Sequence, residues 1–344
     1  MDMTVYRKRF ERFAIDECEQ SSELYKHLAL AVAKDDSLLT LSAEARKGQP
    51  VANLFFASVH YLILKGTKHP VADYYASVTD EPKPIDAHTF TEFKSFCETH
   101  ESELTALLHE KLVQTNEVRR CAYLYPLFSY IYEKVQEPLS CIEIGTSAGL
   151  QLFWDQYRYS YETDLVYGNP FADVHITSSV KGGDINPTYL PSTPPPVAAR
   201  IGVDLHINDV SKEEDRLWLD ALIWPEHQER RELFEQAARV VQSQKAQLIE
   251  ADGVSSLSSL VEKCPSHSTV CVFHTHVANQ FDESLKQQLE ETVNDLGATR
   301  NLFHVYNNMR DSKLRIDSYI DGTKETHVIG ETDGHGRWFE WLLN

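Results

Sequence analysis

The pattern of apolar residues changes near residue 139, and this change constrains the fold more than any other feature of the sequence. Before it, apolar residues recur at helical spacing, as in LYKHLALAVA (24–33) and VANLFFASVHYLILKG (51–66). After it, short apolar runs such as SCIEIG (140–145) and ARIGVDL (199–205) alternate with helical segments. Such alternation is typical of a mostly parallel sheet with helices on both faces.

The chain is therefore predicted to be α/β, with a helical N-terminal domain over 1–115 and an α/β domain over 116–344. Residues 159–198 read as an inserted β-hairpin that turns at Gly168-Asn169-Pro170, followed by a proline-rich connector. Two further segments, THVIGE (326–331) and RWFEWLLN (337–344), end the alternating region. The remaining strands are expected in the segments 246–253, 269–277 and 301–307.

Composition and charge narrow the class of protein. The 344 residues carry a formal net charge of −19, which disfavours a nucleic-acid groove because phosphate contacts need clustered Lys and Arg. No apolar run approaches the roughly 20 residues of a membrane span, and the N-terminal stretch has no apolar signal region. The six cysteines are scattered, as in a reducing compartment. We expect a cytoplasmic protein with a small-molecule or protein substrate.

The segment Gly145-Thr146-Ser147-Ala148-Gly149 fits two patterns. As G-x-S-x-G it matches the nucleophile elbow of serine hydrolases, with Ser147 as nucleophile. As a glycine-rich turn between the 140–145 strand and a helix expected over 148–158, it matches a cofactor-binding loop. A nucleophile elbow follows several strands, whereas a cofactor loop follows the first strand of its sheet. Its place in this chain favours the cofactor loop.

Acidic residues and histidines follow the next strands of the expected sheet. In an open parallel sheet, ligands lie beyond the carboxyl ends of the strands, so these side chains are candidates for binding. Glu143 stands at the first strand end, and Asp204 at the second, where it suits two ribose hydroxyls. Asp252 follows the third strand and suits an adenine amino group, with an ordinary turn as its alternative role. His274 ends the fourth strand as a candidate general base.

His274 and His276 also admit a metal interpretation. Alternate residues of a strand point to the same face, so two imidazoles could reach one ion, but no third ligand is evident in the sequence. We therefore predict no metal site.

This series of strand ends resembles the class I S-adenosylmethionine-dependent methyltransferases. Their pattern is an acidic residue and a glycine-rich loop, then an acid, then another acid before the catalytic strand. This chain has Ser147 where a middle glycine is usual. The resemblance implies a Rossmann-like methyltransferase sheet that closes with an antiparallel pair, THVIGE (326–331) and RWFEWLLN (337–344). It also implies that Glu143, Gly145, Ser147 and Gly149 hold the methionine end of S-adenosylmethionine. Asp204 would hold the ribose and Asp252 the adenine.

A closer resemblance covers most of the chain. The motifs QTNEVRR (114–120), EIGTSAGLQLFWDQYRYSY (143–161), RIGVDLHINDV (200–210) and VFHTHV (272–277) are similar to the bacterial family called domain of unknown function 2332. The resemblance implies a methyltransferase-like sheet behind a helical N-terminal part, and it implies no particular reaction.

Two further groups of residues are candidates for substrate binding. Asn116, Glu117 and Arg119 form a polar group before the first strand, and interdomain hydrogen bonding is the alternative role for it. Asp155, Tyr157 and Arg158 follow the glycine-rich loop, where packing is the alternative role. We expect both groups to meet His274 in a pocket between the helical domain and the carboxyl edge of the sheet.

The sequence thus favours a methyltransferase that uses S-adenosylmethionine on a small-molecule or protein acceptor. The alternatives are a non-catalytic binding module on the same fold and, more remotely, a serine hydrolase that uses Ser147.

Overall fold

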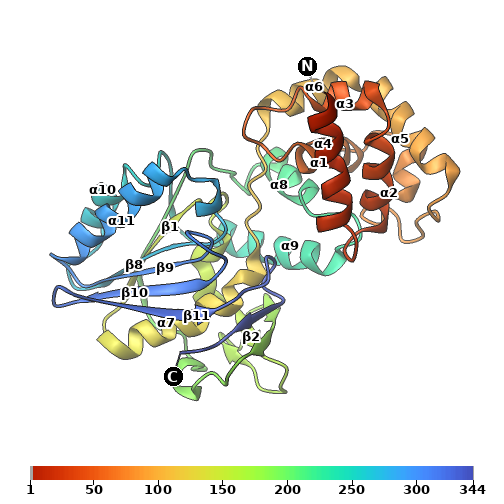
Figure 1. Cartoon of the computed structure of the whole chain (residues 1–344). Coiled ribbons are helices and arrows are strands. Elements are labelled where there is room, and N and C mark those ends of the chain that lie inside the picture. The colour runs from red at the N-terminus through yellow and green to blue at the C-terminus, as the bar shows by residue number, and fades with distance from the viewer. Residues whose placement is uncertain (1–2, 344) are drawn as a thin grey trace. The chain divides into compact units, whose positions relative to one another are not determined.

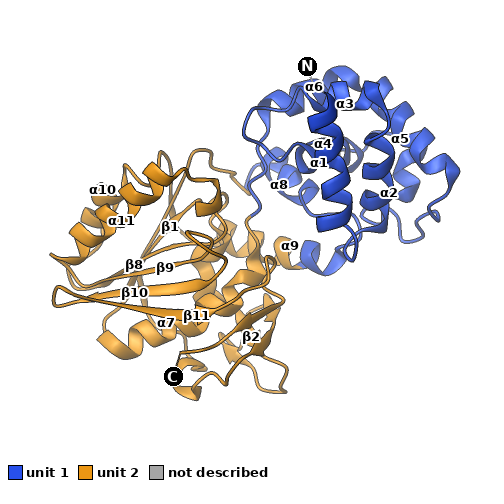
Figure 2. Cartoon of the chain, in the orientation of Figure 1, with its two compact units in different colours: residues 1–115, 211–232 blue, residues 116–210, 233–344 orange. Residues whose placement is uncertain are grey.

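The computed structural model describes residues 3–343 and divides the chain into two compact units (Figure 2). Unit 1 comprises residues up to 115 together with 211–232, and unit 2 comprises 116–210 and 233–344. The segment 211–232, expected in the α/β domain, thus clusters with the N-terminal helices. Trp218 accounts for this, because its Nε1 donates to the carbonyl of Leu112 at 2.9 Å and its ring lies 5.9 Å from that of Tyr61.

Unit 1 is helical, as the spacing of apolar residues predicts (Figure 1). Its elements are α1 (Met3–Arg12), a π-helical turn (Phe13–Glu17), α2 (Glu23–Val32), α3 (Asp36–Ser42), α4 (Val51–Leu64), a 3-10 turn (Pro70–Tyr74), α5 (Ala87–Thr99), α6 (Glu101–Glu110), α8 (Glu213–Ala221) and the first residues of α9 (Gln228–Ser243).

Helix α4 is the central helix of unit 1. Its sequence is apolar on almost every side, and such a helix is stable only when it is surrounded by others. The rings of Phe55 and Phe56 pack against Phe10, Tyr25 and Phe93 from three other helices. The result is an aromatic core around α4.

Unit 2 is a mixed α/β structure built on a seven-stranded sheet with the order β11-β10-β9-β8-β1-β6-β7. The five strands from β9 to β7 are parallel, and β10 and β11 complete the sheet as antiparallel strands. The strands of this sheet are β1 (Leu139–Ile144), β6 (Val197–Asp204), β7 (Gln247–Glu250), β8 (Thr269–His274), β9 (Leu302–Tyr306), β10 (Leu314–Ile320) and β11 (Thr323–Gly330).

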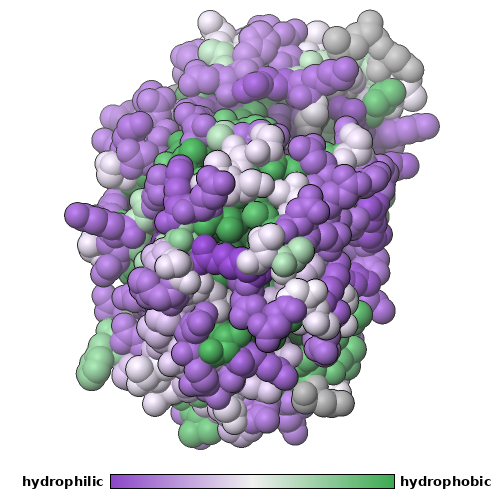
Figure 3. Space-filling model, turned by 90° about the vertical axis from the view of Figure 1, so that its left-hand side faces the viewer, coloured by the Kyte–Doolittle hydropathy of each residue, from purple (hydrophilic) through white to green (hydrophobic). Residues whose placement is uncertain are grey.

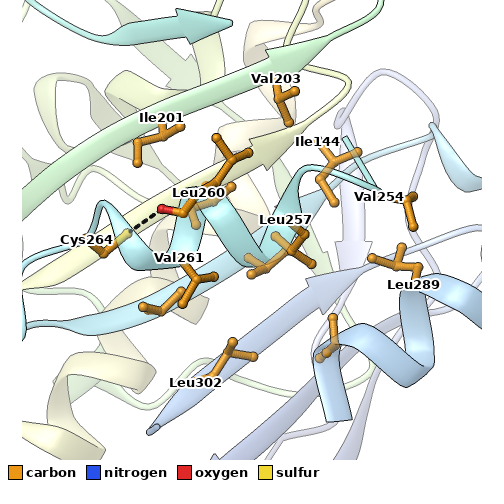
Figure 4. Close-up of a cluster of buried hydrophobic side chains, with 14 of the residues drawn as sticks. Ile144, Ile201, Val203, Val254, Leu257, Leu260, Val261, Cys264, Leu289 and Leu302 are labelled. Carbon is orange, nitrogen blue, oxygen red and sulfur yellow. Dashed lines mark hydrogen bonds between the residues drawn. The ribbon is translucent and has the colours of Figure 1, made fainter. Parts of the chain in front are cut away.

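Helices cover both faces of this sheet. On one face, α10 (Leu257–Glu262) and α11 (Glu283–Gly297) bury a cluster of aliphatic side chains that includes Ile144, Val203 and Leu289 (Figure 4). On the other face, α7 (Cys121–Val135) packs its Phe128 ring edge-on against Phe273 of β8, with 5.3 Å between the ring centres. None of the helices within residues 3–343 is long and apolar enough to span a membrane.

The chain enters the sheet at its middle. From β1 it proceeds outward to β6 and β7, then returns to β8 on the opposite side of β1 and continues to β9. The direction of strand addition therefore reverses between β1 and β8. In open parallel sheets, this reversal opens a crevice at the carboxyl ends of the strands.

The end of the sheet differs from the prediction. The main sheet ends with the antiparallel pair of β10 and β11, whereas β12 (Trp338–Glu340) lies outside this sheet and pairs in parallel with β5 (Ser179–Lys181). The expected antiparallel contact forms in part outside the main sheet, because the amides of Glu340 and Leu342 donate to the carbonyls of Glu331 and Ile329 at 2.8 Å each. The prediction missed β10, although Asp321-Gly322 after it is a two-residue hairpin signal. Both residues have positive φ, 51° and 74°, as a tight hairpin turn requires.

The insertion also differs in detail. It contains a small sheet of order β3-β2-β4, made of β2 (Arg158–Ser160), β3 (Tyr167–Gly168) and β4 (His175–Thr177), and a 3-10 turn at Pro187–Tyr189. The antiparallel pair is β2 with β3, so the hairpin turn lies within 161–166 instead of at Gly168. Residue Gly168 is close-packed, because a Cβ there would lie 2.5 Å from the carbonyl oxygen of Tyr157.

The surface is mainly hydrophilic on the face shown in Figure 3, where apolar residues form small groups among charged and polar ones. This agrees with a chain in which 25% of residues are charged.

Candidate site at the carboxyl edge of the sheet

The GTSAG segment forms a tight loop directly after β1. Gly145, Ser147 and Gly149 have φ of 75°, 49° and 76°, in the left-handed region that glycine tolerates best. The amide of Gly145 donates to the carbonyl of Val203 in β6 at 2.8 Å. After Gly149 the chain forms a 3-10 helix, Leu150–Gln156, in place of the regular helix expected over 148–158. The loop is therefore joined to β6, and no long α-helix begins at it.

Asp204 connects the end of β6 to this loop. Its Oδ2 accepts a hydrogen bond from the amide of Ser147 at 2.8 Å. Asn208 adds two bonds, from its backbone amide to the carbonyl of Ser147 (3.2 Å) and from its side-chain amide to the Ser147 hydroxyl (3.0 Å). The ends of β1 and β6 are thus held together by the residue expected to bind ribose. The next residue, Leu205, is 74% exposed.

Glu143 lies beneath the loop. Its carboxyl is buried, accepts a hydrogen bond from the Thr146 hydroxyl at 2.7 Å, and lies 3.5 Å from the side-chain amide of Asn116. Burial raises the pKa of this carboxyl to about 8, despite these two hydrogen bonds. The carboxyl of Glu143 is therefore mostly protonated at neutral pH.

Asp252 follows β7 at the same edge, and its side chain is exposed. It accepts a hydrogen bond from the amide of Ser255 at 2.7 Å, which is the behaviour of a turn-forming aspartate. The amide of Ala251 donates to the carbonyl of Asp204 at 2.9 Å, so the chain leading to Asp252 runs beside the end of β6.

The polar group before α7 also reaches the loop. The side-chain oxygen of Asn116 accepts a hydrogen bond from the backbone amide of Leu150 at 2.8 Å. The Glu117 carboxylate accepts the amide of Arg119 at 3.2 Å and lies 3.4 Å from His335. All three expected residues precede α7, with Arg119 in a 3-10 turn (Val118–Arg120), and all are buried. The structure thus brings Asn116 together with Glu143 and the loop.

In the second group of expected substrate-binding residues, Asp155 and Tyr157 make their contacts within unit 2. The buried Asp155 forms an ion pair with the partly buried Arg200 at 2.7 Å. Tyr157 is fully buried, and its hydroxyl donates to the carbonyl of Leu150 at 2.7 Å. Arg158 is partly buried in β2. The ion pair of Asp155 and the burial and hydrogen bond of Tyr157 give both residues a structural role.

His274 is the last residue of β8 and is completely buried. Its ring centre lies 5.1 Å from that of His304 and 5.9 Å from that of Tyr306. Neither of its ring nitrogens has a hydrogen-bond partner within residues 3–343. Burial and the neighbouring His304 hold its pKa well below 6.5, so this imidazole is neutral.

A metal interpretation of the two histidines does not fit the geometry. Strand β8 ends at His274, and His276 has φ of 57°, so the two side chains do not follow the alternation of one strand. No group of three His, Cys, Asp or Glu within residues 3–343 is arranged to hold a metal ion.

Comparison with known proteins gives a family. The family model described as uncharacterized proteins conserved in bacteria, domain of unknown function 2332, matches residues 7–341. The chain belongs to this family. Neither a curated protein nor a solved structure matches the chain.

Sequence reasoning missed a buried arginine in this member of the family. Arg120 donates through Nε to the carbonyl of Gly334 (3.0 Å) and through Nη1 to the carbonyl of Thr275 (3.2 Å). The Thr275 hydroxyl in turn donates to the side chain of Gln151 at 3.1 Å. Arg120 therefore links the segment before α7, the end of β8 and the segment after β11. In the sequence, only the position of Arg120 in the QTNEVRR motif indicated a role for this residue.

Proposed function

We propose that this protein binds S-adenosylmethionine at the carboxyl edge of its sheet and transfers the methyl group to a small-molecule or protein acceptor. A single observation carries the proposal. The left-handed loop after β1 is hydrogen-bonded through the Ser147 amide to Asp204 at the end of the neighbouring parallel strand, beside the point where strand addition reverses. Binding at such a point suits a nucleotide-like ligand.

The residues at the end of β6 fit the adenosyl part of this cofactor. Asp204 is only partly buried and offers a carboxylate to ribose hydroxyls. Leu205 exposes an apolar side chain beside it, which suits the face of an adenine ring, and Asp252 is exposed at the end of the next strand. When bound, S-adenosylmethionine would supply an electrophilic methyl group.

The role of the chain in such a reaction is positioning. Methyl transfer is an in-line displacement, so most of the catalysis comes from holding two reactants in alignment. The loop residues Gly145, Ser147 and Gly149 would orient the methionine end, and Asp204 would fix the ribose. The neutral, buried carboxyl of Glu143 would support the loop through Thr146.

A second candidate is a binding module without catalysis, and one observation favours it. A Cβ placed on Gly145 would lie 2.4 Å from Cγ2 of Val277, so the side chain of Val277 covers the glycine that should approach the methionine end. In this alternative, the hydrogen bonds of the loop have only a structural role and hold no cofactor.

Isothermal titration calorimetry with S-adenosylhomocysteine tests the proposal. We expect the wild type to bind and Asp204→Ala to lose about 1.5–3 kcal/mol, the scale of hydrogen bonds to a charged group. Asp295→Ala is the matched control, because Asp295 is exposed on α11. Circular dichroism of each variant checks folding. Absence of binding by the wild type at millimolar ligand would favour the binding module.

A further inference from the structure

His276 is held in an unusual conformation at the end of β8. Its φ is 57°, and the φ of Asn308, which follows β9, is 56°. Non-glycine residues in this region are strained and persist where the surroundings impose them. Ser147 after β1 shares this conformation, so three neighbouring parallel strands each lead into such a residue at one edge of the sheet.

Two asparagines after β9 fix the orientation of His276. The side-chain oxygen of Asn307 accepts the backbone amide of His276 at 2.8 Å. The side-chain nitrogen of Asn308 lies 3.1 Å from Nδ1 of the imidazole. Since an amide nitrogen only donates, Nδ1 accepts this bond and the proton of the neutral ring is on Nε2.

The Nε2–H group is the feature that points to a ligand. Nε2 is buried and has no hydrogen-bond partner within residues 3–343. An unpaired buried donor lowers stability, because it loses its hydrogen bond to water and gains none in the protein, so its presence in an oriented ring calls for an explanation. His274 differs, because its ring lies within the aromatic group of His304 and Tyr306. His276 instead adjoins Val277, whose side chain touches the glycine-rich loop.

The charges around His276 favour a negatively charged partner. Burial, Arg120 and His335 lower the pKa of His276 to about 3, while Asp333 acts in the opposite direction. The ring is therefore neutral at neutral pH and donates from Nε2. A neutral N–H donor in the field of a buried guanidinium suits an anionic oxygen better than a cation.

We propose that His276 binds a carboxylate of the methyl acceptor through Nε2–H, so that the acceptor is an acidic small molecule or an acidic protein side chain. This inference rests on the proposed function, since it places the acceptor beside the glycine-rich loop. His276 would position the substrate as a hydrogen-bond donor, whereas His274 would have no direct contact with it.

Nuclear magnetic resonance of protein labelled with ¹⁵N-histidine tests this inference. The signal of His276 is assigned by its absence in His276→Gln, and S-adenosylhomocysteine is present at saturation. We expect the Nε2–H tautomer, and we expect acetate to shift the Nε2 signal saturably at constant ionic strength. Methylammonium, a cation of similar size, should leave the signal unchanged.

Variants separate binding from folding. Acetate affinity, measured from the signal of ¹³C-acetate, should fall about tenfold in His276→Phe, as expected for loss of one hydrogen bond to a charged group. His276→Gln should retain most of the affinity, because its side-chain nitrogen reaches a position near Nε2. The control is His267→Phe, since His267 is exposed.

The outcomes distinguish this inference from the proposed function. An Nδ1–H tautomer, or acetate affinity unchanged in His276→Phe, would overturn the role of His276 in a protein that still binds S-adenosylhomocysteine. Failure to bind S-adenosylhomocysteine in calorimetry would overturn the proposed function and, with it, the placement of the acceptor.

Discussion

At the scale of single residues, the environment of Ser147 distinguishes the two interpretations of the GTSAG segment, a binding loop and a nucleophile elbow. Its side chain is buried, and its hydroxyl accepts a hydrogen bond from the amide of Asn208 at 3.0 Å. An amide donor cannot remove a proton, so this contact does not activate the hydroxyl for attack.

We therefore predict that a fluorophosphonate probe leaves Ser147 unlabelled. The measurement is mass spectrometry of the intact protein after incubation with the probe, beside a serine hydrolase as positive control. Ser147→Ala serves as the negative control. Stoichiometric modification of the wild type that disappears in Ser147→Ala would restore the hydrolase interpretation.

Buried histidines make stability depend on pH. Burial lowers the pKa of His60 and of His304 to about 3, below the value of about 6.5 expected in the unfolded chain. The folded protein then binds fewer protons, and its stability falls as pH drops below about 6.5, by about 1.4 kcal/mol per pH unit for each imidazole. Glu143 acts in the opposite sense, because its pKa is raised to about 8, and its contribution to stability grows as pH falls towards 4.5.

The variant His304→Phe isolates one of these contributions. Its free energy of unfolding, from urea denaturation, should fall between pH 7 and pH 5.5 by about 1–2 kcal/mol less than that of the wild type. Phenylalanine keeps the ring that stacks on Tyr306, where the ring centres are 4.4 Å apart. An identical pH dependence in both proteins would show that His304 does not resist protonation.

At the scale of elements, the end of β8 covers the loop after β1. The side chain of Val277 occupies the space that a Cβ on Gly145 would need. A ligand that approached Gly145 would have to displace this valine, so the proposed binding of the cofactor requires the segment after β8 to move.

We predict that Val277→Ala strengthens binding of S-adenosylhomocysteine about three- to tenfold, because the removed methyl groups contribute on the order of 1 kcal/mol of packing. Calorimetry measures the effect. Val293→Ala is the matched control, since Val293 is a buried core residue of α11. This substitution should lower stability without changing affinity. Equal affinity of the wild type and Val277→Ala would mean that the valine is no obstacle.

Secondary structure was predictable where the apolar pattern was regular. Strands β1, β6 and β8 are short apolar runs, and their sequences predicted them. Strand β10, LRIDSYI, mixes polar and apolar residues because it contributes Asp317 and Ser318 to partly polar surroundings, and its pattern was missed. The conformation of His276 was also unpredictable, because it depends on Asn307 and Asn308 from a different strand end.

At the scale of the whole molecule, the change of pattern near residue 139 predicted the helical region and the mostly parallel sheet. The assignment of 211–232 to unit 1 could not be predicted, because it depends on the contacts of Trp218 with residues more than 100 positions away. Sequence reasoning expected Glu143 and Asp204 at the loop, since parallel strands share one carboxyl edge. It expected Asn116 there because the segment that contains Asn116 leads directly into the first strand. It could not predict that His274 is fully buried while His276 is partly exposed, because burial depends on tertiary packing.

The central claim is that an adenosyl cofactor binds at the carboxyl edge of the sheet, and a crystal structure grown with millimolar S-adenosylhomocysteine tests it most directly. We predict that the ribose hydroxyls lie on Asp204, that the adenine lies beside Leu205, and that Val277 is displaced from Gly145. Bound ligand at another place, or a ligand-free edge in which Asp204 retains its bond to Ser147 and Val277 still covers Gly145, would contradict the claim.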